Sequence, residues 1–156
     1  MAADPYTYAL TLLARRELSA AQIRERLKRR EFPTADIDAA IARLRASQAL
    51  DDGRVARAHA RTAASIKSRG RARVVREIEA LGIDRATARE AVAEVFGELD
   101  EDALLGRALD RKLRGRRIRD AAEFRRLYQF LMRQGFEPGR IAKALQNRGG
   151  RAFDDQ

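Results

Sequence analysis

Hydrophobic positions in this chain follow one irregular spacing that occurs three times. In the first copy, Ile23 to Ile41, the apolar side chains stand at residues 23, 27, 32, 37 and 41, so the successive gaps are 4, 5, 5 and 4. The same gaps recur from Val74 and again from Leu127, 51 and then 53 residues further on. A gap of 4 places two side chains on one face of an α-helix, whereas a gap of 5 fits neither helix nor strand. Each copy therefore predicts a helix, a short connection holding an inward apolar anchor, and a second helix.

A further amphipathic segment precedes each copy, so each repeat predicts three helices. The apolar faces of these leading segments are Tyr6, Ala9, Leu10 and Leu13; Val55, Ala58, Thr62 and Ile66; and Leu104, Leu105, Ala108, Leu109 and Leu113. Residues that favour helix starts come before many of the predicted helices: Pro5, Ser19 with Gln22, Thr34, Asp51, Asp84, Asp120 and Pro138. We predict that Gly70 ends the second leading helix. A period near 50 residues with three helices in each repeat predicts an all-α fold, with three tandem three-helix-bundle repeats in an elongated, curved array.

Helix-breaking residues between the copies predict the unit boundaries. We expect unit one at residues 1–48, unit two at 49–97 and unit three at 98–150, followed by a disordered tail at 151–156. Each unit is near the size below which a lone hydrophobic core is only marginally stable. The units should therefore support one another.

Composition limits the classes of protein to which the chain can belong. The sequence has only three prolines and is rich in helix-favouring residues. It has no cysteine, which excludes disulfides, thiolate metal sites and cysteine nucleophiles. It holds no apolar run long enough to span a membrane, and the opening Met1 to Pro5 lacks the features of a signal peptide. We expect a cytoplasmic protein.

No arrangement of residues indicates an enzyme or a metal site. The only histidine, His59, has Val55 and Ala63 four residues to either side. The acidic runs 51–52 and 100–102 fall where helices are predicted to begin, and capping is a sufficient explanation for them. The chain has no glycine-rich phosphate loop and no nucleophile beside a base. We expect no catalytic residue, no metal and no cofactor.

A strong positive charge is the clearest functional feature. The net charge is +10, and 29 of the 33 basic residues are arginine, whose fork suits phosphate and carboxylate. Two clusters stand out in which acids on the same stretch do not balance the charge: Arg69, Arg71, Arg73 and Arg76; and Arg111, Lys112, Arg114, Arg116, Arg117 and Arg119. Aromatic residues are sparse and mostly follow core spacing, so no base-stacking platform is evident. The clusters predict salt-sensitive contact with a phosphate backbone or an acidic partner.

Four motifs follow one another along the chain. They are Tyr8-Ala9-Leu10-x-Leu12-Leu13-Ala14-Arg15-Arg16-x-x-Ser19; Leu50-Asp51-Asp52 with Ala56; Gly70-x-x-Arg73-Val74-x-x-Glu77-Ile78-x-x-x-Gly82-Ile83; and Arg133-Gln134-Gly135-Phe136 with Ile141 and Ala144-Leu145. Over residues 6–148, their order and spacing resemble the RecX regulatory proteins. The chain departs from that family at Glu31, where a glycine is usual, at Val55, where a phenylalanine is usual, and at His59, where a tyrosine is usual.

The resemblance implies a non-enzymatic regulator of tandem three-helix units that binds filaments of the RecA recombinase on DNA. Such a protein limits filament growth and inhibits strand exchange, ATP hydrolysis and coprotease activity. The implied partners are the RecA filament and the DNA phosphate backbone, single- or double-stranded, without sequence specificity, and the protein is expected to act as a monomer. Arg15 and Arg16, from the first motif, join the two basic clusters as predicted contact residues.

Two other interpretations remain open from the residues alone. The chain could be a basic helical DNA-binding protein that acts without a recombinase, although acidic residues on the predicted third helices argue against their entering a major groove: Asp36, Asp38, Glu90 and Glu94. It could also be a scaffold that binds only proteins, which would lose nothing if alanine replaced Arg114, Arg116, Arg117 and Arg119.

Overall fold

The structure is a computed structural model that describes residues 4–150, and within that range every regular element is a helix. In order these are α1 (Pro5–Arg15), α2 (Ala20–Arg29), α3 (Thr34–Ala46), α4 (Asp52–Ser65), α5 (Arg71–Ala80), α6 (Arg85–Phe96), α7 (Glu101–Leu113), α8 (Ala121–Arg133) and α9 (Pro138–Leu145), then the short, loosely wound η1 (Gln146–Gly150). The predicted all-α class is confirmed.

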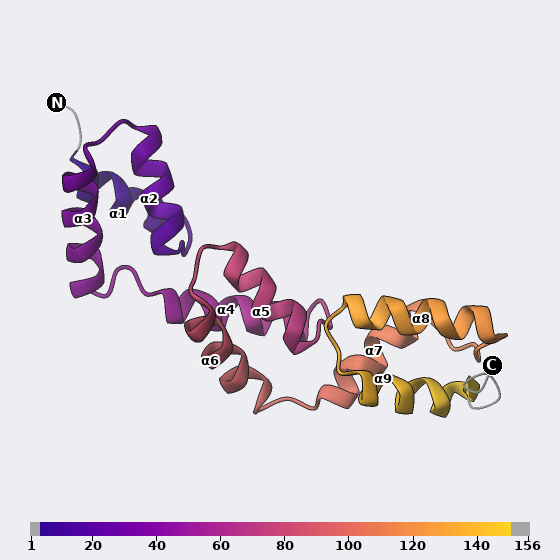
Figure 1. The fold of residues 1–156 in the computed structure, drawn as a ribbon. Coiled ribbons are helices and arrows are strands. Elements are labelled where there is room, and N and C mark those ends of the chain that lie inside the picture. The colour runs from indigo at the N-terminus through magenta and orange to yellow at the C-terminus, as the bar shows by residue number, and fades with distance from the viewer. Residues whose placement is uncertain (1–3, 151–156) are drawn as a thin grey trace.

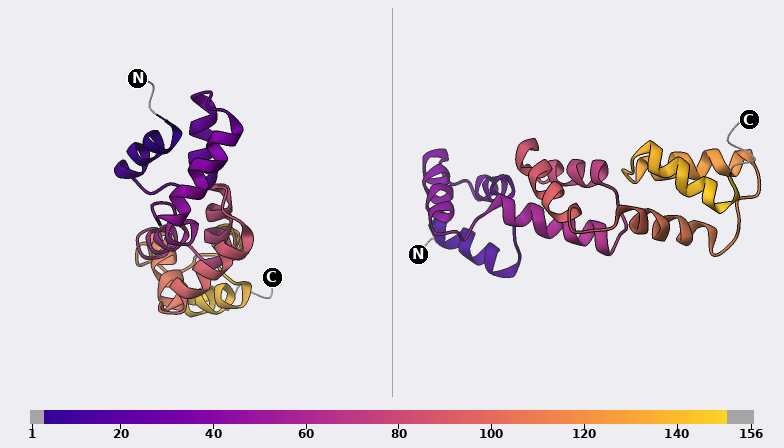
Figure 2. Two further views of the ribbon diagram at one scale, coloured as in Figure 1. Left: turned by 90° about the vertical axis from the view of Figure 1, so that its left-hand side faces the viewer. Right: turned by 90° about the horizontal axis from the view of Figure 1, so that it is seen from below.

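The helices pack in three successive groups of three. Helices α1 to α3 contact one another, as do α4 to α6 and α7 to α9; we refer to these groups as units one, two and three. The units follow one another in a bent, elongated row with α1 and α9 in its end groups (Figure 1), and the view from below shows the same extended arrangement (Figure 2). The exact boundaries 1–48, 49–97 and 98–150 stay a prediction, and the predicted disordered tail at 151–156 lies outside the described residues.

Side-chain caps explain where most helices begin. Ser19 and Gln22 form the predicted capping box of α2: the Gln22 backbone N–H donates to Ser19 Oγ at 3.1 Å, and the Ser19 N–H donates to Gln22 Oε1 at 2.9 Å. At α4, α6, α7 and α8 an aspartate side chain at the N-cap accepts a bond from the backbone N–H three residues on. The predicted cap at Thr34 is wrong, because Pro33 holds the cap position of α3 without a side-chain bond.

Gly70 also differs from its prediction. Helix α4 already ends at Ser65, and Gly70 stands at the N-cap of α5 instead. Its backbone N–H donates to a carbonyl of unit three, as described below. Gly70, which was expected only to end a helix, therefore takes part in packing between units.

Buried side chains form two hydrophobic cores rather than one for each unit. Unit one has its own core, whereas the core of units two and three is continuous from Val55 to Leu145. The buried face of α4 is also rotated from the predicted one: Ala58, Thr62 and Ile66 are exposed, and the face that packs consists of Val55, Ala56, Ala60, Ala63 and Ala64. Small alanines allow α4 to lie close against α6.

The same joint connects successive units. At the N-cap of α2, Ser19 Oγ donates to the Leu81 carbonyl of unit two at 2.5 Å. At the N-cap of α5, the Gly70 N–H donates to the Gln134 carbonyl of unit three at 2.8 Å. Each accepting carbonyl precedes a glycine with positive φ, Gly82 or Gly135. The starts of α2 and α5 thus contact the turn that follows the middle helix of the next unit.

Polar contacts supplement the first of these joints. Asp52 Oδ1 accepts a bond from the Ala20 N–H at 2.8 Å, and the Arg54 guanidinium donates to both oxygens of Glu17 at 2.8 and 3.3 Å. Units one and two are held by these bonds, whereas units two and three share buried apolar surface.

Replacement of Ser19 with alanine should lower the free energy of unfolding by about 1–2 kcal/mol. The change removes a helix cap and the side-chain bond to the Leu81 carbonyl at the joint. Urea unfolding of the variant measures the loss. Ser47→Ala is the matched control, since Ser47 Oγ donates to the Leu44 carbonyl at the end of its own helix. An equal loss in both variants would contradict a role for Ser19 in the joint.

Candidate polyanion-binding surface

Glu77 neutralises part of the first basic cluster. It stands on α5 and pairs with the guanidinium groups of Arg69 and Arg73, the latter at 3.4 Å. The Nε2 atom of His59 lies 3.3 Å from the other Glu77 oxygen, so the histidine has a carboxylate partner on a neighbouring helix. The prediction that acids do not balance this cluster is therefore wrong for Arg69 and Arg73.

The two remaining members of the first cluster differ from each other. Arg71 Nε lies 2.9 Å from Glu101 Oε1 on α7, and its guanidinium lies over the Phe96 ring at 5.6 Å from the centroid. Arg71 is therefore one of the links between units two and three. Arg76 is exposed, and within residues 4–150 no carboxylate pairs with it.

Glu123 neutralises one half of the second cluster. This carboxylate is 6% exposed and accepts bonds from Arg116 Nη2 at 2.8 Å and from the Arg119 backbone N–H at 2.8 Å, with Arg119 Nε at 3.4 Å. The Arg116 bond, followed by the Arg119 N–H bond, lowers the pKa of Glu123 to about 2. The loop between α7 and α8 is therefore anchored by ion pairs from two partly exposed arginines to one buried carboxylate.

The other half of the second cluster forms a groove where units two and three meet. Lys67, just after α4, lines it together with Arg111, Lys112 and Arg114 from the end of α7 and with Phe130 and Gln134 from α8 and its C-cap. Its volume is about 480 Å³, and no carboxylate from the described chain lines it. We call it the inter-unit groove.

The structure divides the twelve predicted contact residues into two sets. Five are paired with carboxylates: Arg69, Arg71, Arg73, Arg116 and Arg119. Seven have no acidic partner in the described part of the chain: Arg15, Arg16, Arg76, Arg111, Lys112, Arg114 and Arg117. The unpaired set does not form one patch, since two members lie in unit one, one in unit two and four in unit three. The contact role of all twelve stays a prediction.

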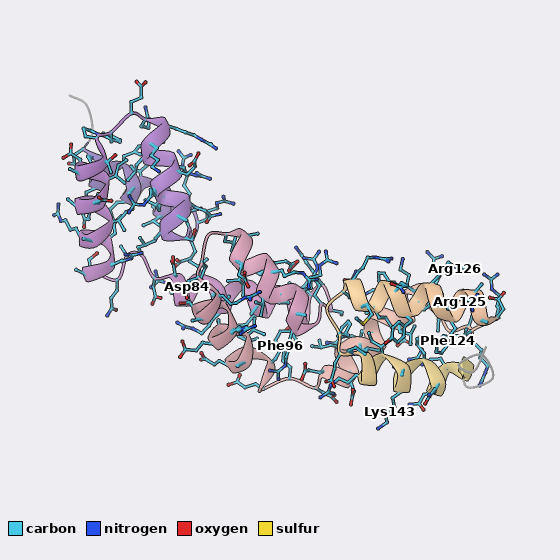
Figure 3. The ribbon with its side chains drawn as sticks, in the orientation of Figure 1. Asp84, Phe96, Phe124, Arg125, Arg126 and Lys143 are labelled. Atoms are coloured by element: carbon cyan, nitrogen blue, oxygen red, sulfur yellow. The ribbon has the colours of Figure 1, made fainter. Side chains whose placement is uncertain are left out.

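Some basic residues outside the predicted clusters also lack an acidic partner. Arg125 and Arg126 are exposed on α8 and lie at its end away from unit two, and Lys143 projects from α9 (Figure 3). No acidic residue stands between Phe124 and Arg133, so the sequence itself could have indicated that these two arginines add unbalanced positive charge. Nothing in the sequence places Lys67 beside Arg111.

The described residues hold no group of three or more His, Asp or Glu side chains arranged for a metal ion. None of the helices in that range is both long and apolar enough to cross a membrane.

Comparison with known proteins places these features in a family. Residues 6–44 match the family model described as RecX, first three-helix domain. The regulatory protein RecX of Chromobacterium violaceum is 36% identical over 151 residues, which cover 94% of this chain and 90% of that protein. The Pelodictyon phaeoclathratiforme protein of the same name is 31% identical, covering 90% of this chain and 86% of the relative. The RecX of Geobacillus kaustophilus is 32% identical over 92% of this chain, which spans only 54% of that longer protein.

Two solved structures have the same fold. A crystal structure of a regulatory protein RecX matches with a TM-score of 0.78 at 19% identity, covering 92% of this chain and 70% of the other. The crystal structure of RecX from Lactobacillus salivarius matches with a TM-score of 0.75 at 18% identity, covering 93% and 94%.

Proposed function

The chain belongs to the RecX family of regulatory proteins, which are not enzymes, and from that premise we propose that it is a negative regulator of the RecA recombinase. In this proposal it binds RecA–DNA filaments, limits their growth, and inhibits strand exchange, ATP hydrolysis and coprotease activity. It acts as a monomer in the cytoplasm, and the seven unpaired cations contribute most of its attraction to the DNA phosphate backbone.

The observation that carries the proposal is the distribution of unpaired charge over a long body. Each of the three units carries predicted contact cations without an acidic partner in the described chain, and the units follow one another in a row (Figure 1). An elongated body with charge at several points suits a polymeric, negatively charged target, because weak contacts at separate points add their effects. Complementary charge would also speed the encounter with a filament.

ATP hydrolysis by RecA on single-stranded DNA tests the proposal. Hydrolysis should fall when this protein is added at a low ratio to RecA, and the inhibition should weaken as salt rises, because phosphate contacts are salt-sensitive. Electron microscopy of the same mixtures should show fewer or shorter filaments. Unchanged hydrolysis on filaments of normal length would contradict the proposal.

The alternative is a basic helical protein that binds DNA without a recombinase. The unpaired cations favour DNA contact of that kind as well. The two proposals differ in stoichiometry: a protein that acts only by covering DNA needs enough copies to occupy the strand, whereas a filament regulator acts when it is scarce.

A further inference from the structure

We propose that the inter-unit groove is a binding site for single-stranded nucleic acid, in which the phosphates contact its four cations and one base stacks on Phe130. The inference rests on the proposed function, because it assigns a place for the strand on a regulator of a DNA-bound filament. It concerns residues from both units, including Lys67, Phe130 and Gln134, which lie outside the predicted basic clusters.

The charge of the groove favours a polyanion. Lys67, Arg111, Lys112 and Arg114 line it, and none of the four pairs with a carboxylate in the described chain, unlike the neighbouring Arg116 and Arg119. Four like charges converging on one concave site repel each other, and a phosphodiester chain would relieve that repulsion. The two halves of this basic cluster therefore have different roles: one anchors a loop and the other is free for a ligand.

The Phe130 ring favours a nucleotide over a simple anion. It is half-buried and packs against the core, and the Lys112 ammonium lies 4.4 Å from its centroid. Lysine has a long, flexible stem, so the ammonium can move to a phosphate and leave the ring face to a base. Base–aromatic stacking requires an unstacked base, which a single strand offers and a duplex does not.

Gln134 adds a group that can bond to the edge of a base. Its backbone carbonyl is fixed by the 2.8 Å bond from Gly70, whereas its side-chain amide has no hydrogen bond within the described residues. An amide offers both a donor and an acceptor. The volume of about 480 Å³ lies in the usual range for a small-ligand site and is large enough for a single nucleotide.

The groove is already formed in the unbound protein. Its two walls come from different units, and an Arg111 guanidinium N–H donates to the Ile66 carbonyl at 3.2 Å across the boundary. The Gly70–Gln134 bond and the shared core hold the same boundary. Little ordering is therefore needed on binding, which favours affinity.

Fluorescence anisotropy of a labelled oligothymidine with the full chain tests the site without any recombinase. The triple variant Lys67→Gln, Lys112→Gln, Arg114→Gln should lower affinity roughly tenfold or more at low salt and reduce the slope of log K against log salt by about 2, at about 0.7 for each phosphate contact. The matched control Lys28→Gln, Arg61→Gln, Arg89→Gln removes the same charge from exposed cations outside the groove and should change affinity only slightly. Phe130→Leu, which keeps an apolar side chain against the core, should weaken binding roughly fivefold or more.

Three results would overturn the proposal. An equal loss in the control triple would mean that charge anywhere on the surface is sufficient. An unchanged affinity for oligothymidine in Phe130→Leu would exclude stacking. Binding of a polyglutamate peptide that depends on the groove cations, with oligothymidine binding that does not, would assign the groove to an acidic protein segment. RecA is absent from this assay, so a negative result would reject the groove as a binding site without rejecting the proposed regulation of RecA filaments. Likewise, unchanged ATP hydrolysis in the RecA experiment would reject the regulatory proposal without rejecting the groove.

Discussion

Replacement of Gly135 with alanine should lower the free energy of unfolding by roughly 3 kcal/mol or more. Gly135 has φ of +97°, and a Cβ atom there would lie 2.3 Å from the Arg73 backbone nitrogen and 2.6 Å from the Arg73 Cβ. A backbone nitrogen at the start of a packed helix cannot move aside as a flexible side chain can. The variant must therefore separate unit three from α5 and open the core that units two and three share.

Glu31→Ala is the control for this prediction. Glu31 occupies the equivalent turn of unit one and already has φ of +62° with a side chain present. It is exposed to solvent, so alanine should change stability by less than about 0.5 kcal/mol. Thermal or urea unfolding measures both variants. If Gly135→Ala were as mild as Glu31→Ala, the close approach at the joint would not matter for stability.

The three equivalent turns show what sequence alone could and could not reveal. The repeated gaps of 4 and 5 predicted the turns, because those gaps depend only on local helix geometry. The departure at Glu31 was visible as a missing glycine, but its explanation lies in packing. Gly82 lies against Ala21 and Gly135 against Arg73, whereas the Glu31 turn faces solvent. A glycine is needed where a unit contacts the one before it.

Charge pairing was predictable only where it is local. Glu77 lies four residues after Arg73 within α5, so helical spacing alone would have indicated this partner. Glu123 also lies four residues after Arg119, but Arg119 precedes Asp120, the N-cap of α8, so the separation is short without being helical. By contrast, Arg71 and Glu101 are 30 residues apart and meet only through the packing of units two and three. Lys67 reaches the groove of unit three for the same reason. The inter-unit groove therefore could not be predicted from the sequence.

Acid should destabilise the protein partly through Glu123. Its pKa is about 2 in the folded protein and near 4.5 for an ordinary glutamate, so the folded state favours the ionised form. A lowered folded pKa adds stability that is fully present above about pH 5 and is lost as pH falls toward 2. This difference in pKa corresponds to about 2–3 kcal/mol of folding stability. That figure is lower than the direct conversion of the pKa difference, because the Arg116 and Arg119 partners are partly exposed and solvent screens their charge.

Glu123→Gln should remove that pH-dependent contribution. The variant should be about 2–3 kcal/mol less stable than the unmodified protein at pH 7, and the difference should shrink toward zero near pH 2, where the glutamate itself becomes protonated. Urea unfolding at a series of pH values measures both curves. Glu25→Gln is the control, because Glu25 is exposed and lies 3.6 Å from an exposed Arg29, where screening leaves little energy to lose. If the difference in free energy of unfolding between Glu123→Gln and the unmodified protein stayed constant from pH 7 to pH 2, the glutamate would stabilise the loop through packing and neutral hydrogen bonds rather than through its charge.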